Sequence, residues 1–249
     1  MFTRPDDLRD QQVAESFEQA WGVRVTAIEY RAVGFGSHHW EALSADDRWF
    51  LTVDEIDNDQ GQRAAALAAA SALFANGHDW VVGPAPTIGG AISQAIDDRY
   101  ELAAFPFVEG DHAGHQPYES AEQRLAVLDC LVELHGASLP SGKQPEVDDL
   151  AIPARGGLFQ VLDDPTSRWD SGPFAEPARQ LVSRYTDALG AAFERCDELV
   201  ATVQPDTFVV THGEPHRGNV IFTADGVRVV DWDTARRAPR ERDLSLIHI

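Results

Sequence analysis

The stretch that decides the fold runs from Thr211 to Asp233 and reads THGEPHRGNVIFTADGVRVVDWD. Within it, Glu214 stands five positions before Asn219, and Asp231 stands twelve positions after Asn219. The runs TFVVT and GNVIF before Ala224-Asp225-Gly226, and VRVVDW after it, predict a hairpin, because these turn residues separate β-branched segments. A loop, an Asn and a returning strand would bring three polar side chains together at one end of a short sheet.

This group of side chains suits phosphoryl transfer. Such a reaction needs a carboxylate to orient the attacking hydroxyl, and oxygen ligands to hold Mg²⁺ against the nucleotide phosphates. Asn219 and Asp231 offer those ligands, and Glu214 offers the carboxylate. The alternative is a surface hairpin whose Asp and Asn serve only its turns. The hairpin pattern and the returning DWD favour the functional interpretation.

The same stretch resembles the HGDxxxxN motif, followed by an Asp at the end of a hairpin, of aminoglycoside phosphotransferases and small-molecule kinases. His212-Gly213-Glu214 matches the catalytic-loop triplet, and Asn219 and Asp231 match the metal-binding Asn and Asp. The resemblance implies a protein-kinase-like α+β fold with two lobes. Residues 1–109 would form an N-lobe of antiparallel sheet plus helix. Residues 110–249 would form a mainly helical C-lobe that carries the catalytic hairpin, with ATP or GTP and Mg²⁺ as cofactors.

Two departures from this family pattern concern the reaction directly. Glu214 stands where the family has Asp, and its extra methylene moves the carboxylate by roughly 1 Å. Thr52 stands in the third strand where a phosphate-binding Lys is expected, and the next helix, 62–75, contains no Glu to pair with one. The chain's single lysine, Lys143, belongs to a linker. Two interpretations stay open: a kinase with altered phosphate anchoring, or a nucleotide-binding protein with weak or no transfer activity.

Other residues are candidates for binding the nucleotide. Gly34 and Gly36 lie between two predicted strands and would let backbone amides approach phosphates, although an ordinary tight hairpin explains them equally. The resemblance adds Ser37 and Thr52 beside the phosphates. It also implies a hinge between the lobes, where backbone groups near Phe105 and Phe107 bind adenine; an edge strand is the alternative. The missing Lys could be replaced by His38, His39, Arg48 or Arg63. Each of these side chains could instead serve only on the surface or in packing.

Helical patterns occupy most of the remaining sequence. We expect helices within 6–21 and 62–75, a helix from Ser120 to Ser138 with Ser120 and Gln123 as a capping box, and a long helical stretch from Pro173 to Val200. Cys130 and Cys196 fall in helical patterns without metal-ligand spacing, which predicts reduced thiols.

Composition excludes some classes of function. A net charge of −21 over 249 residues argues against binding to nucleic acid, which needs clustered Lys and Arg. The same charge would attract a cationic small molecule, although a salt-adapted or GC-rich genome would also produce it. We expect a cytoplasmic protein that does not enter a membrane, because no apolar run is long enough and the N-terminus lacks a signal peptide's apolar core. The sequence does not indicate an oligomeric state.

The predicted function is therefore transfer of phosphate from ATP or GTP to a hydroxyl of a small amine-bearing molecule, with an aminoglycoside-type antibiotic favoured. The alternatives are a metabolic kinase for a sugar, a choline-like alcohol or an amino alcohol, and a catalytically weak pseudokinase. Family members continue well beyond the metal-binding Asp, whereas sixteen residues follow Asp233 here. The final LSLIHI matches one reading frame of a sequencing adapter, so we expect a longer natural chain and a foreign tail from about Ser245.

Overall fold

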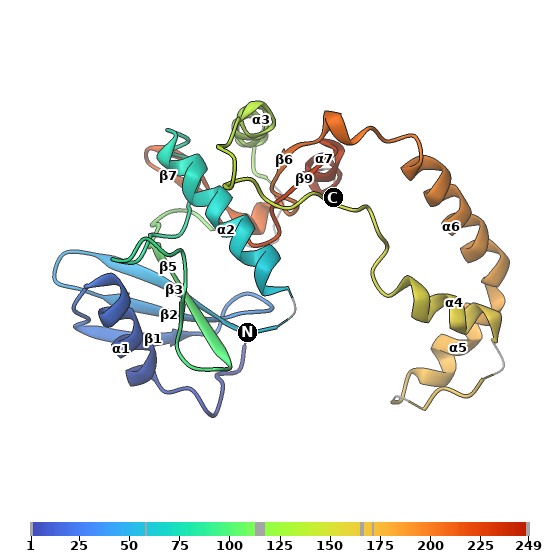
Figure 1. Cartoon of the computed structure of the whole chain (residues 1–249), viewed down its shortest axis with the longest axis horizontal. Coiled ribbons are helices and arrows are strands. Elements are labelled where there is room, and N and C mark those ends of the chain that lie inside the picture. The colour runs from blue at the N-terminus through green and yellow to red at the C-terminus, as the bar shows by residue number, and fades with distance from the viewer. Residues whose placement is uncertain (1, 58, 113–117, 165–166, 171, 248–249) are drawn as a thin grey trace. The chain divides into compact units, whose positions relative to one another are not determined.

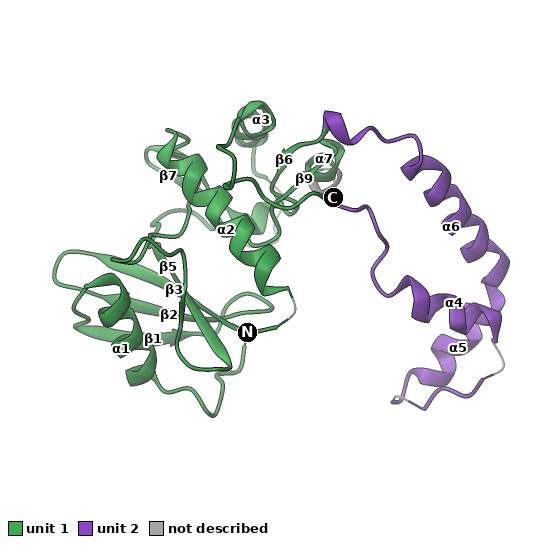
Figure 2. Cartoon of the chain, in the orientation of Figure 1, with its two compact units in different colours: residues 1–147, 208–249 green, residues 148–207 purple. Residues whose placement is uncertain are grey.

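The chain forms two compact units, which are described separately. The computed structural model describes residues 2–57, 59–112, 118–164, 167–170 and 172–247 (Figure 1). The first unit comprises residues 1–147 and 208–249, and the second comprises residues 148–207 (Figure 2). The predicted lobe boundary at Glu109 lies inside the first unit and stays a prediction.

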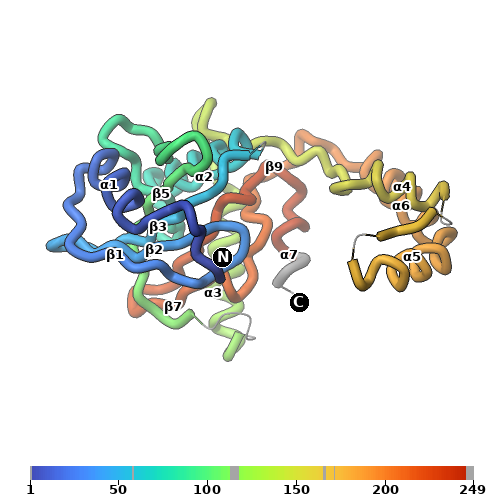
Figure 3. The backbone as a smooth tube through the Cα atoms, turned by 90° about the horizontal axis from the view of Figure 1, so that it is seen from below, coloured from blue at the N-terminus to red at the C-terminus, as the bar shows by residue number. Residues whose placement is uncertain are grey.

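An antiparallel sheet forms the N-terminal part of the first unit. Its strand order is β1-β2-β3-β5-β4. The strands are β1 (Ala27–Arg31), β2 (His38–Leu43), β3 (Arg48–Glu55), β4 (Gln94–Ala95) and β5 (Tyr100–Pro106). Helix α1 (Asp10–Trp21) lies along this sheet in two views (Figures 1 and 3). Phe17 of α1 packs with Trp40, Leu51 and Leu102 in one apolar cluster, which fixes one face of the sheet as its core side.

The opposite face of the sheet carries the residues that were predicted to bind nucleotide. Thr52 of β3 pairs with His39 of β2, and Phe50 pairs with Phe105 of β5. Because residues directly opposite each other in a ladder share a face, these side chains point away from the α1 cluster. Helix α2 (Gln60–Ala75) contacts this region through its first turn, while its buried Ala66, Ala70 and Leu73 belong to the second core.

That second core surrounds the predicted hairpin. Strands β7 (Val220–Thr223) and β8 (Gly226–Val229) form the hairpin, as predicted. The elements packed with it are α2, α3 (Ala121–Gly136) and β6 (Val209–Thr211), and β6 pairs with β9 (Arg236–Ala238). The Ser120 side chain accepts a hydrogen bond from the Gln123 backbone N–H, so the predicted start of α3 is correct.

The segment TFVVT does not join the hairpin, contrary to expectation. Its strand, β6, pairs with β9 in a separate two-stranded sheet. The reason lies between β6 and β7: Gly213 takes a left-handed conformation at φ 98°, and residues Arg217–Asn219 form a short helical turn. These two bends redirect the chain, so β6 cannot continue into β7.

The second unit is helical and contains α4 (Arg155–Asp163), α5 (Ala175–Arg184) and α6 (Thr186–Val200). The long helical stretch predicted from Pro173 is two helices, because Tyr185 leaves helical geometry at φ −110° and ψ 17°. Phe159 and Phe193 pack with ring centroids 5.0 Å apart. None of the helices in the described part of the chain combines the length and the apolarity needed to cross a lipid bilayer.

Candidate active site

Asp243 fixes the backbone of the loop that precedes the hairpin. This residue lies in α7 (Glu241–Ile247) and is fully buried. One carboxylate oxygen accepts from the Gly213 amide at 2.6 Å, and the other accepts from the His212 amide at 3.1 Å. The second oxygen also lies 2.9 Å from Nε2 of His135 on α3. Three segments distant in sequence are therefore joined at one carboxylate.

Gly213 is required by this arrangement. Its φ of 98° is one that residues with a Cβ rarely adopt. A Cβ at this position would also lie 2.2 Å from Nη1 of Arg242, the neighbour of Asp243. The Gly of the HGE triplet thus lets α7 approach the loop closely.

His212 supports the loop as a neutral imidazole. It is completely buried, and Nε2 lies 2.9 Å from the Val230 carbonyl oxygen. Nδ1 accepts a 3.2 Å hydrogen bond from the Glu214 amide, so the proton belongs on Nε2. Burial lowers the pKa of His212, which keeps the ring neutral. The ring also packs on Trp232, with centroids 4.6 Å apart, and so ties the loop to the DWD segment.

Asn219 is oriented with its amide oxygen available. Its Nδ2 donates to the Glu214 carbonyl at 3.0 Å, and its backbone carbonyl accepts from the Val230 amide at 3.0 Å. Among the described residues, no donor bonds the side-chain oxygen. This residue therefore links the Glu214 loop to the strand that leads into Asp231, while one oxygen ligand stays free.

The carboxylates of Glu214, Asp231 and Asp233 influence one another. Asp231 has the left-handed φ of 68° and is open to solvent on one side. Partial desolvation, followed by the charges of Asp233 and Glu214, raises its pKa to about 7. Burial, with the charges of Asp54 and Glu214, also raises the pKa of Asp233. The charges of Glu214, Asp231, Asp233 and of Asp54 on β3 thus act on one another, and the Arg63 guanidinium offsets part of this repulsion at Asp233.

These residues fit a divalent ion that is shared with a nucleotide. Among the described residues, no three His, Cys, Asp or Glu side chains form a complete metal-binding set. Mg²⁺ nevertheless binds commonly through one or two carboxylates, with phosphate oxygens and waters completing its shell. The free amide oxygen of Asn219 and the carboxylate of Asp231 supply such a partial set, and the mutual repulsion of the acids favours a cation.

The glycine turn and Thr52 contribute no cation. Gly34 and Gly36 both have left-handed φ values, 69° and 88°, between β1 and β2. Ser37 is buried, and its Oγ donates to Oδ1 of Asp54 at 2.5 Å. Thr52 Oγ1 lies 3.3 Å from Nδ1 of His39, a ring whose pKa burial lowers to about 4. Neutral Thr52 and His39 therefore occupy the place where the family pattern expects Lys.

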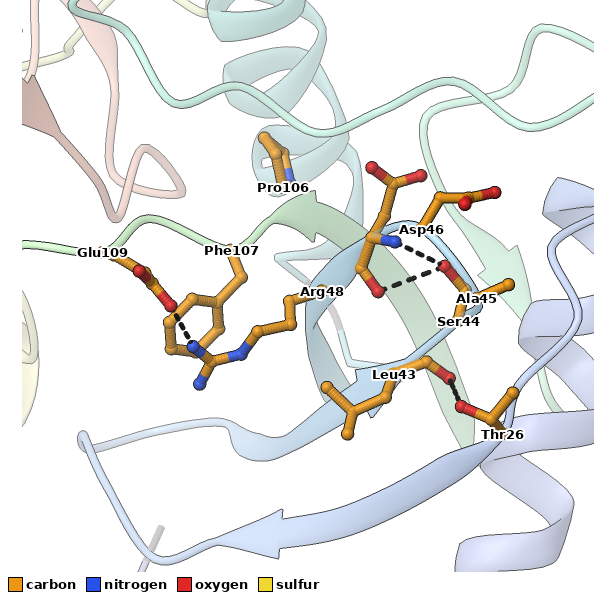
Figure 4. A pocket seen from close by; sticks show the side chains of 10 residues that line it. Thr26, Leu43, Ser44, Ala45, Asp46, Arg48, Pro106, Phe107 and Glu109 are labelled. Atoms are coloured by element: carbon orange, nitrogen blue, oxygen red, sulfur yellow. Dashed lines mark hydrogen bonds and ion pairs between the residues drawn. The ribbon is translucent and has the colours of Figure 1, made fainter.

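At the predicted hinge, Phe105 is the second-last residue of β5 and lies on the Thr52 face, and Phe107 follows the end of the strand. The Phe107 amide donates to the Arg48 carbonyl at 3.0 Å, and the Arg48 guanidinium stacks 3.7 Å above the Phe107 ring. A cavity of about 510 Å³ opens here, with Thr26, Leu43 and Glu109 in its lining (Figure 4). None of Glu214, Asn219 and Asp231 lines it, so this cavity is separate from the candidate catalytic and metal-binding residues.

Sequence reasoning assigned no role to Asp243 or Asp54. The three hydrogen bonds of Asp243 depend on contacts across 30 and more positions, which local patterns do not reveal. Asp54 had a usable signal: it lies two positions after Thr52, so strand alternation places it on the same face. His135, in the last turn of α3, contacts the Asp243 carboxylate.

The chain shares sequence and fold with known proteins. The family described as "Phosphotransferase enzyme family" matches residues 28–248, which is most of the chain. The chain belongs to this phosphotransferase family. A curated relative, Protein StrN of Streptomyces griseus, is 27% identical over 203 residues. That alignment covers 78% of this chain and 62% of the relative, so the chain spans less than two thirds of the relative's length.

Solved structures share the fold of this chain. Spectinomycin phosphotransferase in complex with ADP and spectinomycin aligns with TM-score 0.75 and 18% identity, covering 97% of this chain and 74% of the other. An amicoumacin kinase in complex with AMP-PNP and Ca²⁺ aligns with TM-score 0.65 and 12% identity, covering 96% and 68%. A microcompartment-associated aminopropanol kinase aligns with TM-score 0.61 and 16% identity, covering 96% and 74%. The predicted kinase-like α+β fold is confirmed.

Proposed function

We propose that this phosphotransferase moves the γ-phosphoryl group of ATP or GTP to a hydroxyl of a small amine-bearing molecule, with an aminoglycoside-type acceptor favoured. The observation that carries the proposal is the convergence of Glu214, Asn219 and Asp231 at one end of the β7–β8 hairpin. Family membership supplies the reaction class, and this convergence supplies residues for it.

Each residue has a distinct part in the proposed reaction. Glu214 is solvent-exposed and, among the described residues, its carboxylate makes no hydrogen bond, so it is free to accept one from the acceptor hydroxyl. Asn219 and Asp231 would hold Mg²⁺, which when bound neutralises charge on the nucleotide phosphates. The hydrogen bonds from Asp243 and His212 hold the loop before any ligand arrives, and this preorganisation lowers the cost of positioning the hydroxyl.

Nucleotide binding at the sheet is the second part of the proposal. Phe105 and Phe107 would contact the base, and Gly34, Gly36, Ser37 and Thr52 would lie beside the phosphates. The Phe107 amide is occupied by Arg48, so a base at this hinge would bond the Phe107 carbonyl oxygen or the backbone that follows. The ADP and AMP-PNP named with the solved relatives support a nucleotide as the phosphate donor.

Charge supports an amine-bearing acceptor. The net charge of −21 and the exposed Glu214 would favour the approach of a cation. Relatives named for spectinomycin and for aminopropanol support a small polar alcohol as the acceptor. The negative charge is therefore the basis for proposing an amine-bearing acceptor.

The neutral pair Thr52 and His39 favours a second candidate, a protein that binds nucleotide with little transfer. Phosphotransferases of this fold normally use a β3 Lys to hold the phosphates. Its absence predicts weaker nucleotide binding unless another cation replaces it.

An acceptor screen tests the proposal. The purified chain would be incubated with ATP or GTP and Mg²⁺ against aminoglycosides, amino alcohols, choline-like alcohols and neutral sugars, with ADP or GDP release measured. We expect release only with amine-bearing acceptors, and a phosphorylated product by mass spectrometry. Release with neutral sugars alone would contradict the charge argument. Mg²⁺-dependent nucleotide binding without release for any acceptor would favour the second candidate.

A further inference from the structure

The same two elements that hold the Lys–Glu pair in other kinases carry an ion pair of reversed polarity here. Asp54 of β3 lies two positions after Thr52, on the same face of the strand. Arg63 lies in the first turn of α2 and is the single basic residue of that helix. Their closest atoms, Nε of Arg63 and Oδ2 of Asp54, are 3.8 Å apart.

Arg63 has donor capacity that the protein leaves unused. Its Nε is buried and has no hydrogen-bond partner. Among the guanidinium nitrogens of the described residues, only Nε of Arg217 shares this state. Nη2 of Arg63 donates to the Glu55 carbonyl at 3.2 Å and to Asp57 at 3.2 Å, which fixes the fork. At 3.8 Å, Asp54 attracts the guanidinium without accepting from Nε. A buried donor of this kind is unfavourable unless a partner arrives.

The position of Arg63 also opposes helix electrostatics. The N-terminal turn of a helix disfavours a cation, because its unpaired amides already carry partial positive charge. A cation and a helix N-terminus together form a favourable site for an anion with several oxygens. The side chain is only 16% exposed, so an anion bound here would be partly shielded from water, where charge-assisted hydrogen bonds are stronger.

Arg63 is placed at the candidate active site by its neighbours. Gln62, the preceding residue, accepts a hydrogen bond from Arg236 of β9. Arg236 pairs with Thr211 of β6, three positions before Glu214. On the other side, Asp54 accepts from Ser37 at the end of the glycine turn. The guanidinium thus lies between the glycine turn and the strands that carry the catalytic loop.

We propose that Arg63 is the phosphate-binding cation of this phosphotransferase, replacing the missing β3 Lys, and that Asp54 is the positioning residue that holds it. The guanidinium would donate from Nε and its free positions to non-bridging oxygens of the nucleotide's α- and β-phosphates. Asp54, bonded to Ser37, would connect the cation to the glycine turn, so that the turn and the cation are held in one arrangement. This inference rests on the proposed nucleotide binding.

The test compares a nucleotide that has phosphates with one that lacks them. Calorimetry would measure binding of ADP with Mg²⁺, and of adenosine, to the full chain and to Arg63→Ala. We expect the ADP dissociation constant to rise about 30-fold, roughly 2 kcal/mol at 1.4 kcal/mol per tenfold, while adenosine binding stays within about twofold. Arg63→Lys should recover part of the loss, because charge returns without the planar fork.

A matched control removes the same charge from the same lobe. Arg99 is exposed and pairs with Asp7 and Glu55. Arg99→Ala should leave both ADP and adenosine binding unchanged, and thermal unfolding should show that each variant is folded. Equal ADP affinity in the full chain and in folded Arg63→Ala would overturn the assignment of Arg63 alone. Equal loss of ADP and adenosine binding would also overturn it, since the role would then be structural. Failure of the unaltered chain to bind ADP would overturn both this inference and the proposed function.

Discussion

The two sides of the candidate active site follow the family pattern to different degrees. The catalytic-loop side has the histidine, glycine and asparagine of the motif, and buried hydrogen bonds to Asp243 and Val230 hold them in place. The sheet side has lost the Lys and the Glu of its usual ion pair, and Asp54 and Arg63 stand on the same elements with opposite charges. The loop proposed to orient the acceptor thus keeps the family motif, while the residues proposed to bind the phosphates differ from it.

This difference has a physical basis. The catalytic loop is fixed by backbone amides that share one buried carboxylate, so a change at any member leaves buried groups unpaired. A phosphate needs only a cation within reach, and that cation can come from a strand or from the neighbouring helix. The predictions below test whether the two sides differ in this way, from the largest expected effect to the smallest.

The largest effect is expected at Asp231. Asp231→Asn keeps a residue that tolerates the left-handed backbone at φ 68°, and removes only the charge. We expect nucleotide turnover to fall about 10³-fold, equivalent to roughly 4 kcal/mol, because the metal loses its carboxylate ligand. Turnover would be followed by ADP release. Asp225→Asn, at the exposed tip of the hairpin, is the matched control and should be silent; normal turnover in Asp231→Asn would exclude the metal assignment.

At Asp243 we expect a smaller loss of turnover, together with a loss of stability. Asp243→Asn places an amide where the carboxylate accepts from Gly213, His212 and His135. We expect turnover to fall about 100-fold, because the loop loses its support, and the free energy of unfolding to fall by about 3 kcal/mol from unpaired buried donors. Denaturant unfolding and steady-state kinetics would measure both. A stable variant with full activity would show that the loop keeps its conformation without the Asp243 carboxylate.

Glu214 tests how closely the loop is fitted to its unusual acid. The amide of this residue bonds His212, and its carbonyl bonds Asn219, so the backbone cannot follow a shorter side chain. We therefore expect Glu214→Asp to lower kcat about 30-fold, with the nucleotide KM unchanged, since the carboxylate retracts by roughly 1 Å. Glu214→Gln should lower kcat further, because it keeps the length and removes the base. A rise in kcat for Glu214→Asp would mean instead that Glu is a compromised catalytic residue.

Elements of the fold were predicted correctly from the sequence where a local pattern is typical of a single structure. The hairpin at Ala224-Asp225-Gly226 and the start of α3 at Ser120 follow from turn and capping chemistry that is local. The pairing of β6 with β9 and the break at Tyr185 could not be predicted in this way, because each depends on contacts outside its own segment.

The candidate site shows the same division. Glu214, Asn219 and Asp231 were found because their spacing is a motif, and their roles stay predictions. Asp243 and the Asp54–Arg63 pair involve partners that only the folded chain brings together. Arg63 was one of four candidate cations in the sequence, and what distinguishes it is a buried donor without a partner.

The smallest effect expected is a pH dependence that separates the two sides. Asp231 has its pKa raised to about 7 in the metal-free protein, whereas His39 on the sheet side has its pKa lowered to about 4. A metal ligand must be deprotonated, so protons compete with Mg²⁺ at Asp231 below about pH 7 and not above it. We expect the Mg²⁺ concentration that half-saturates ADP binding to rise about tenfold from pH 8 to pH 6, since the deprotonated fraction of such a group falls about tenfold.

Two variants assign this pH dependence to a side of the site. Asp231→Asn should abolish it, because the titrating ligand is gone, although Mg²⁺ binding will also be weaker throughout. His39→Gln should leave it unchanged, because a ring with a pKa of about 4 stays neutral across the whole window. If His39→Gln removed the pH dependence and Asp231→Asn preserved it, the sheet would be the side that responds to protons. The pH-dependent step in Mg²⁺ binding would then have to be assigned to the sheet and not to Asp231.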